Sequence, residues 1–179
     1  MIGRRLFTLI ASSALIGTAL GVASAQILAL PTKSTPRSIT TPNVPHIQLN
    51  VQTNPAMNDA LLRQVSQMPG VVLRDTVISL PGAVGFWVDN AVPLTRPEFI
   101  VAGREFAHMH PDGSLHASLP VELAAHAVEK GWAVPHPWAD TRPGMAGFVM
   151  IYTPNTADEL QVVIELVQAS FGFVTGTTA

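Results

Sequence analysis

The chain has 179 residues, 47% of them hydrophobic and 12% charged, which is enough for one well-buried core but short for two. It contains no cysteine, and this excludes disulfides, thiolate nucleophiles and thiolate metal sites. The formal net charge is −2 and the basic residues are scattered, so composition gives no electrostatic basis for binding nucleic acid.

The amino-terminal residues have the layout of an export signal. Arg4 and Arg5 precede an apolar run over residues 6–22, and the small residues 23–25 form a cleavage site. We expect residues 1–25 to be a signal peptide, or an uncleaved anchor that attaches the chain to a membrane through the apolar run. The paired arginines fit both the general and the twin-arginine route. The protein is therefore expected to be periplasmic or extracellular, with membrane attachment as the alternative.

Residues 26–55 are rich in proline, serine and threonine, which is typical of an extended arm outside a core. The folded domain is expected over residues 56–176. Its first helix is expected from Pro55 to Gln67, because Asn54 can cap it and proline fits the first helical position.

The rest of the domain alternates strand and helix patterns. We expect strands at 71–79 and 84–88, a hairpin of 100–110 with 114–119, a helix at 120–130, an irregular loop at 133–141, a strand at 147–152 and a last helix at 157–170. This order predicts an α+β fold, with a mostly antiparallel sheet and about three helices packed on one face.

The hairpin turn at residues 110–113 is the most informative local pattern. Its sequence His-Pro-Asp-Gly predicts a three-residue loop with a glycine bulge. That loop pairs His108 with His116, whereas a two-residue turn would move His116 to the other face. Side chains alternate along a strand, so Phe106, His108, His110 and His116 are expected on one face and the apolar odd-numbered residues on the other.

Three imidazoles on one face can serve two kinds of chemistry. His108, His110 and His116 can bind a divalent metal, zinc or iron, with a coordination position left open. They can also act without metal as acids, bases and hydrogen-bond donors near neutral pH. His136 is a candidate fourth member, and Arg104 has the parity to hold an anionic substrate. The simpler alternative is a solvated strand face.

Other aromatic and histidine residues have two interpretations each. Trp132 and Trp138 either wall a ligand pocket or cover the core. Tyr152 either donates a proton to a substrate or caps the sheet. His46 lies in the arm and His126 on a helix, so both are expected to be structural or incidental.

Several short motifs occur in the same order along the chain as in a known family. They are REFAHMH at 104–110, SLHASL at 114–119, KGW at 130–132, HP at 136–137, YTP at 152–154 and DE at 158–159, before the last helix. Together they resemble the domain of the fungal luciferases, over roughly residues 104–175. Those enzymes oxidise a hydroxylated styryl-pyrone with molecular oxygen, use no known organic cofactor, and emit light when a peroxide intermediate breaks down.

The resemblance implies an oxygen-using oxidoreductase that acts on a small hydroxylated pyrone or polyketide-like ring, with molecular oxygen as co-substrate and no organic cofactor. His108, His110, His116 and His136 would surround the ring, and one of them would take its hydroxyl proton. Arg104 would hold the resulting enolate.

The chain also departs from the family pattern. Asn155 stands where the fungal pattern has arginine, the hairpin turn is shorter, and Trp138 replaces a smaller apolar residue, so a different substrate is expected. The export signal argues against light emission as the role. A metal-dependent hydrolase with three histidines and a non-enzymatic ligand-binding domain of the cell envelope remain as alternatives.

Overall fold

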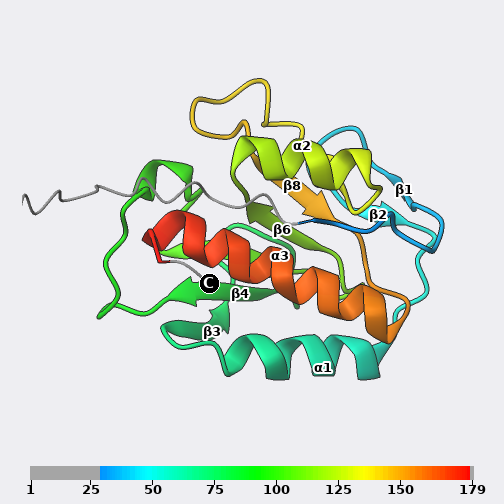
Figure 1. Cartoon of the computed structure of the whole chain (residues 1–179), viewed down its shortest axis with the longest axis horizontal. Coiled ribbons are helices and arrows are strands. Elements are labelled where there is room, and N and C mark those ends of the chain that lie inside the picture. Colours follow the sequence, from blue (N-terminus) through cyan, green and yellow to red (C-terminus); the bar gives the residue numbers. More distant parts are fainter. Residues whose placement is uncertain (1–28, 178–179) are drawn as a thin grey trace, which may run out of the picture.

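The computed structural model describes residues 29–177, and the expected export segment, residues 1–25, lies outside them. The described chain forms a six-stranded sheet, a separate two-stranded sheet and three α-helices (Figure 1). No helix within it is long and apolar enough to cross a membrane. The predicted α+β class is confirmed.

The main sheet is antiparallel throughout, with strand order β3-β4-β5-β6-β8-β7. In chain order the elements are β1 (Ile39–Thr40), β2 (Gln48–Leu49), α1 (Pro55–Ser66), β3 (Val71–Asp75), β4 (Val84–Val88), a 3₁₀ turn (Pro97–Phe99), β5 (Glu105–Met109), β6 (Leu115–Ser118), α2 (Val121–Glu129), β7 (Ala133–Pro135), β8 (Phe148–Ile151) and α3 (Ala157–Thr175). β7 lies where a loop was predicted; it is a short edge strand, a position that tolerates its proline.

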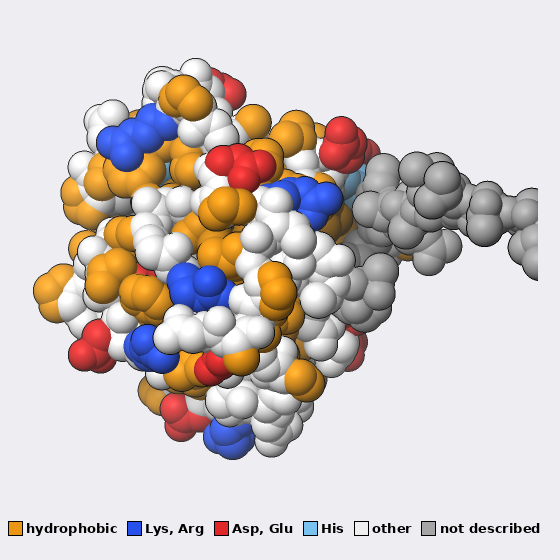
Figure 2. Space-filling view, turned by 90° about the vertical axis from the view of Figure 1, so that its left-hand side faces the viewer, with side chains coloured by type: hydrophobic (Ala, Val, Ile, Leu, Met, Phe, Trp, Pro, Cys, Tyr) orange, Lys and Arg blue, Asp and Glu red, His pale blue; other side chains and the backbone are white. Residues whose placement is uncertain are grey.

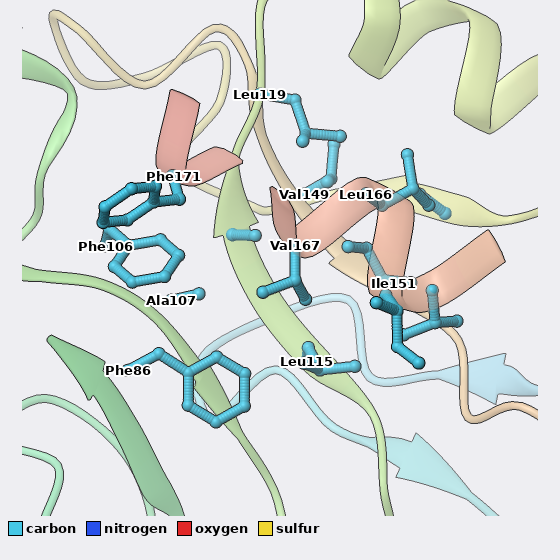
Figure 3. Close-up of a cluster of buried hydrophobic side chains, with 14 of the residues drawn as sticks. Phe86, Phe106, Ala107, Leu115, Leu119, Val149, Ile151, Leu166, Val167 and Phe171 are labelled. Carbon is cyan, nitrogen blue, oxygen red and sulfur yellow. The ribbon is translucent and has the colours of Figure 1, made fainter. Parts of the chain in front are cut away.

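The helices cover one face of this sheet, and α3 packs across β5 and β6 (Figure 1). Ala107 and Leu115 point to that side and are buried in one apolar cluster with Val167 and Phe171 of α3 (Figure 3). Ala117 belongs to the same cluster. These are the odd-numbered hairpin residues that the alternation assigned to the core. The even-numbered face of the hairpin is therefore turned away from the helices.

Side chains of both charges are interspersed on the face shown in Figure 2, and neither sign gathers into a patch there. With a formal net charge of −2, this face has no strong field to steer a charged partner.

The hairpin has the predicted register. His108 pairs with His116, and the His110 N–H donates to the Ser114 carbonyl at 2.8 Å. Gly113 has a φ of 89°, the left-handed conformation that the glycine bulge requires. The turn thus places three histidines on one face of two neighbouring strands.

A β-bulge in β5 was not predicted. Phe86 pairs with Ala107 and Trp87 with Glu105, so Phe106 is an extra residue between them. The expectation that Phe106 shares the histidine face is wrong, because the bulge turns it into the core, where its ring lies 6.4 Å from that of Phe86. The bulge also moves Glu105 onto the histidine face.

Residues 29–55 are not an arm outside the core, and that expectation is also corrected. Leu30 is buried in the main apolar cluster, and Gln48 is buried with its Nε2 donating to Thr153 Oγ1 at 2.6 Å. The pairing of β1 with β2 folds the segment between them over the sheet. His46 lies in that segment and is only 4% exposed.

Replacing Gly113 with alanine is expected to lower the free energy of unfolding by about 2–3 kcal/mol. The new Cβ would lie 2.4 Å from Asn58 Oδ1 and 3.0 Å from Thr153 Cγ2, in addition to the strain at positive φ. Gly82→Ala is the matched control, since its φ is 83° but its Cβ would lie 3.5 Å from Pro111 Cγ, so only strain of about 1 kcal/mol applies. Urea unfolding measures both, and equal losses would contradict a steric role for Asn58.

Candidate functional site

Five imidazoles meet on the sheet face opposite the helices. His108 and His116 come from β5 and β6, His110 from the first residue of the hairpin turn, His136 from the residue after β7, and His46 from the segment between β1 and β2. All five are buried, with at most 5% of each residue exposed. The predicted group of four is therefore brought together, with one addition.

His46 is the member that the sequence pattern did not reveal. Its ring stacks on that of His116 with a centroid distance of 5.3 Å and an interplanar angle of 13°, and it meets His136 edge-on at 5.1 Å. A single histidine in a proline-rich segment has no periodicity that would place it, so only the tertiary contacts identify it.

The imidazoles form one side of a cavity of about 220 Å³. A dry cavity of about 150 Å³ can bind benzene, so this volume is sufficient for a small ring. The other lining residues are mainly apolar: Val44, Pro45, Ile78, Ser79, Leu80, Trp138 and Phe148. The imidazole nitrogens on one side of the cavity thus face mainly apolar side chains on the other.

Trp138 contacts both the cavity and His136. Its backbone N–H donates to His136 Nδ1 at 3.0 Å, and the two rings lie 4.7 Å apart. The guanidinium carbon of Arg142 lies 3.5 Å from the centroid of the Trp138 ring, so Arg142 covers the indole. Because Nδ1 of His136 accepts a hydrogen bond, the neutral ring carries its proton on Nε2.

Three residues expected to bind substrate do not line the cavity. Arg104 donates to backbone carbonyls of the 88–92 loop, at 3.0 Å from Nε and 2.8 Å from a terminal nitrogen. Trp132 is buried and donates from Nε1 to the Pro31 carbonyl at 2.6 Å. Tyr152 is buried away from the cavity lining. For Arg104 the cause is the bulge, which reverses the side-chain alternation before Phe106.

Glu105 lies on the histidine face of the sheet, where Arg104 was expected. It is 2% exposed and accepts hydrogen bonds from Thr76 Oγ1 at 2.7 Å and from the Val77 N–H at 2.9 Å, while its Oε1 lies 3.1 Å from His108 Nδ1. Gly85 on β4 leaves room for the carboxyl group, because a Cβ there would lie 3.1 Å from Glu105 Cδ.

From Glu105 a chain of hydrogen bonds continues through the rings. Nε2 of His108 lies 3.0 Å from Nδ1 of His116, and Nε2 of His116 lies 3.2 Å from Nδ1 of His46. One buried carboxylate is thereby connected to three imidazoles in series.

Burial keeps four of the five imidazoles neutral at neutral pH. It lowers the pKa of His46, that of His110 to about 4, that of His116 well below 6.5 and that of His136 to about 3, and charges on neighbouring imidazoles lower the last three further. Neutral imidazoles with available lone pairs are bases, so the cluster can accept a proton from a bound acid.

We expect stability to fall as the pH drops below 6.5. The unfolded chain protonates its histidines near 6.5, whereas the pKa of His136 in the fold is about 3, so the unfolded state binds protons first. The contribution of His136 to the free energy of unfolding is complete above pH 6.5 and is lost progressively as the pH falls toward 3. His136→Asn keeps an acceptor for the Trp138 N–H and should remove about 1.4 kcal/mol per pH unit of this slope. Urea unfolding between pH 4.5 and 6 measures it; an unchanged slope would contradict a neutral His136.

The residues that carry this cluster match a known family. The family model described as Luciferase domain matches residues 103–170, which include four of the five histidines. Residues 103–170 of this chain therefore form a domain of the luciferase type. The luciferases of Armillaria gallica and Armillaria mellea are 30% identical to it over 170 and 171 residues, which is 84% of this chain and 63% of theirs. That of Neonothopanus nambi is 37% identical over 82 residues, 42% of this chain and 30% of its own.

The chain spans less than two thirds of the length of these luciferases, and no solved structure matches it. His46 lies outside the matched segment. The cavity of the luciferase domain is therefore completed by a residue that precedes the domain.

Two sets of three imidazoles in the described chain have nitrogens within 4.8 Å of one another, as a metal site requires. The sets are His108, His110 and His116, and His46, His116 and His136. The second set fits a metal poorly, because Nε2 of neutral His136 carries the proton. The first fits better, because Ser114 Oγ holds Nδ1 of His110 at 3.0 Å and leaves Nε2 of His110 for a metal. Nε2 of His108 would bind the metal only in exchange for its hydrogen bond with Nδ1 of His116.

Proposed function

We propose that the protein is an oxygen-using oxidoreductase of the luciferase type, which oxygenates a small hydroxylated ring of the pyrone or polyketide class without an organic cofactor. The observation that carries this proposal is the cavity in which neutral imidazoles face an apolar wall. The imidazoles supply a base for the ring hydroxyl, and the apolar wall accommodates the ring and molecular oxygen. We also propose, from the signal-like residues 1–25, that it acts outside the cytoplasm.

The proposed reaction needs no oxidant other than oxygen. An imidazole nitrogen takes the proton of the ring hydroxyl, so the O–H bond breaks and an N–H bond forms. The electron-rich enolate is oxidised by molecular oxygen, a carbon–oxygen bond forms, and the proton returns to the reduced outer oxygen to give a hydroperoxide. The apolar wall, with Trp138 and Phe148, limits water that would solvate the enolate and weaken its reaction.

The test is oxygen uptake by the purified chain with a panel of hydroxylated 2-pyrones, before and after chelation, with elemental analysis of the same sample. Substrate-dependent uptake by metal-free protein is expected. His126→Gln is the control, since His126 lies on α2 with its Nδ1 3.7 Å from Glu129 and outside the cavity. Ligand retention with no uptake would contradict the proposal and favour a binding domain.

A metal-dependent hydrolase is the second candidate. It is favoured by the geometry of His108, His110 and His116, whose spacing fits a divalent metal, with Glu105 and Ser114 orienting two of the rings. It predicts near-stoichiometric zinc or iron in the purified protein, lost in His110→Ala, and ester hydrolysis that requires the metal. A metal-free preparation with full activity would exclude it.

A further inference from the structure

We propose that Glu105 sets the direction of every hydrogen bond in the chain through His108 and His116 to His46, so that Nε2 of His46 is a base presented to the cavity. Glu105 is then a positioning residue and His46 a catalytic one. This inference rests on the proposed function for its chemistry, but the hydrogen-bond direction can be tested without any substrate.

The first step is the protonation of His108. A backbone N–H can only donate, so Glu105 Oε2 must accept from Val77 at 2.9 Å. Oε1 accepts from Thr76 Oγ1 at 2.7 Å, so both oxygens of the carboxyl group act as acceptors. A ring lone pair that faced a carboxylate oxygen across 3.1 Å would be repelled, whereas an N–H is attracted, so Nδ1 of His108 carries the proton of that ring.

The second step carries this direction along the rings. A neutral imidazole has one N–H and one lone pair. With its proton on Nδ1, His108 accepts at Nε2 from Nδ1 of His116 over 3.0 Å. His116 then accepts at Nε2 from Nδ1 of His46 over 3.2 Å. The lone pair at the end of the chain is on Nε2 of His46.

The third step concerns the cavity. His46 lines it, and Nε2 of His46 has no hydrogen-bond partner among residues 29–177. His136 presents an N–H instead, because its Nδ1 accepts from Trp138. His110 offers a second lone pair at Nε2, since its Nδ1 donates to Ser114 Oγ, which in turn donates to Asp112. His46 is the base that is connected to a fully buried carboxylate.

The connection allows proton transfer without creating a buried cation. The ring O–H breaks and N–H forms at Nε2 of His46, whose Nδ1 proton passes to Nε2 of His116. The Nδ1 proton of His116 passes to Nε2 of His108, and the Nδ1 proton of His108 passes to Glu105. Glu105 becomes a carboxylic acid as the substrate becomes an enolate, so the charge of the site stays at −1. This avoids the cost of burying an additional ion pair.

Glu105→Gln tests the direction with almost no change of shape. The amide oxygen must stay opposite the Val77 N–H, so the NH₂ group faces Nδ1 of His108, which must now accept. Every ring in the chain then changes tautomer, and His46 carries its proton on Nε2. Thr76→Val is the matched control, because it removes one donor to the carboxylate but leaves the carboxylate itself.

The measurement is long-range ¹H–¹⁵N correlation on the full chain with ¹⁵N-labelled histidine at pH 7.5. Nδ1–H on His46 and His116 is expected in the unsubstituted protein and in T76V, and Nε2–H in E105Q. Nε2–H on His116 in the unsubstituted protein would overturn the inference, as would tautomers that do not change in E105Q. If E105Q does not fold, the spectrum of the unsubstituted protein decides alone.

Oxygen uptake separates this inference from the proposed function. With an active pyrone, E105Q and His46→Gln are both expected to lose at least 90% of kcat, and T76V to keep most of it. Reversed tautomers with full activity in E105Q, or activity lost only in His110→Gln, would overturn the role of His46. If no protein oxidises any pyrone but the tautomers reverse, the hydrogen-bond direction stands and the proposed function fails.

Discussion

Replacing His116 with leucine is expected to lower oxygen uptake with a hydroxylated pyrone by about 10²- to 10⁴-fold, the usual contribution of a positioned acid or base. His116 is the central ring of the cluster, with His108 at 3.0 Å on one nitrogen and His46 at 3.2 Å on the other. Leucine is close to it in volume and can fill the same buried position, but it has no nitrogen and interrupts the chain. The measurement is kcat at saturating substrate with an oxygen electrode.

The fold of this variant must be shown to persist, because five buried imidazoles are packed together. Near-native urea unfolding at pH 7.5 would show it. His126→Leu is the control for loss of a histidine elsewhere, since its side chain is 26% exposed on α2. Turnover within a factor of three of the unsubstituted protein in H116L would contradict both the proposed base chemistry and the hydrogen-bond chain.

Replacing Glu159 with glutamine is expected to lower the free energy of unfolding by about 3–5 kcal/mol, because it leaves the Lys33 ammonium buried without a counter-charge. The two side chains are each 2% exposed, and Lys33 Nζ lies 2.8 Å from Glu159 Oε2. Glu159 also accepts from the Thr35 N–H at 3.0 Å and from the Asn155 N–H at 2.9 Å. It therefore fastens residues 33–35 to the start of α3.

Two controls make the effect of Glu159 specific. Glu165→Gln, on the same helix with a hydrogen bond from Gln161 at 3.2 Å, should change stability by less than about 0.5 kcal/mol. Adding Lys33→Met to E159Q removes the unpaired charge and should recover part of the loss. A double variant no more stable than E159Q would contradict the ion pair as the cause.

The pH dependence of the same pair has a definite sign. Burial alone would raise the pKa of Glu159, but hydrogen bonds from Lys33, the Asn155 N–H and Thr35 outweigh it and lower the pKa to about 2. The ordinary value is 4.5, so the unfolded state binds this proton first. The contribution is full above pH 4.5 and is lost as the pH falls through 2. E159Q should lack this acid transition.

The sequence predicted most of the fold because its strongest signals are local. The turn at residues 110–113 determines its own geometry, and from it the pairing of His108 with His116 followed correctly. The cap at Asn54 likewise marked the start of α1, and its side chain does accept from the N–H of Met57. Such features depend on neighbours in the chain, which a sequence displays directly.

The incorrect predictions concern residues whose positions depend on contacts with residues distant in the sequence. Phe106 fits a regular alternation, and only its packing against Phe86 and Phe171 favours the bulge that moves it and Glu105. Glu105 is odd-numbered, so an unbroken alternation would place its carboxyl group on the core side, which is unfavourable. His46 contacts a partner 70 residues away, and the sequence contains no signal for that distance.

The position of His46 means that the working unit is longer than the recognised domain. A chain trimmed to residues 103–170 would lose strands β3 and β4 and six residues that line the cavity, which are Val44, Pro45, His46, Ile78, Ser79 and Leu80. Val44, Pro45 and His46 come from the segment between β1 and β2, which is separate from the strands that carry the other histidines. Choice of substrate can therefore be engineered at Val44 and Pro45 while His46 and the four histidines of the sheet are left in place.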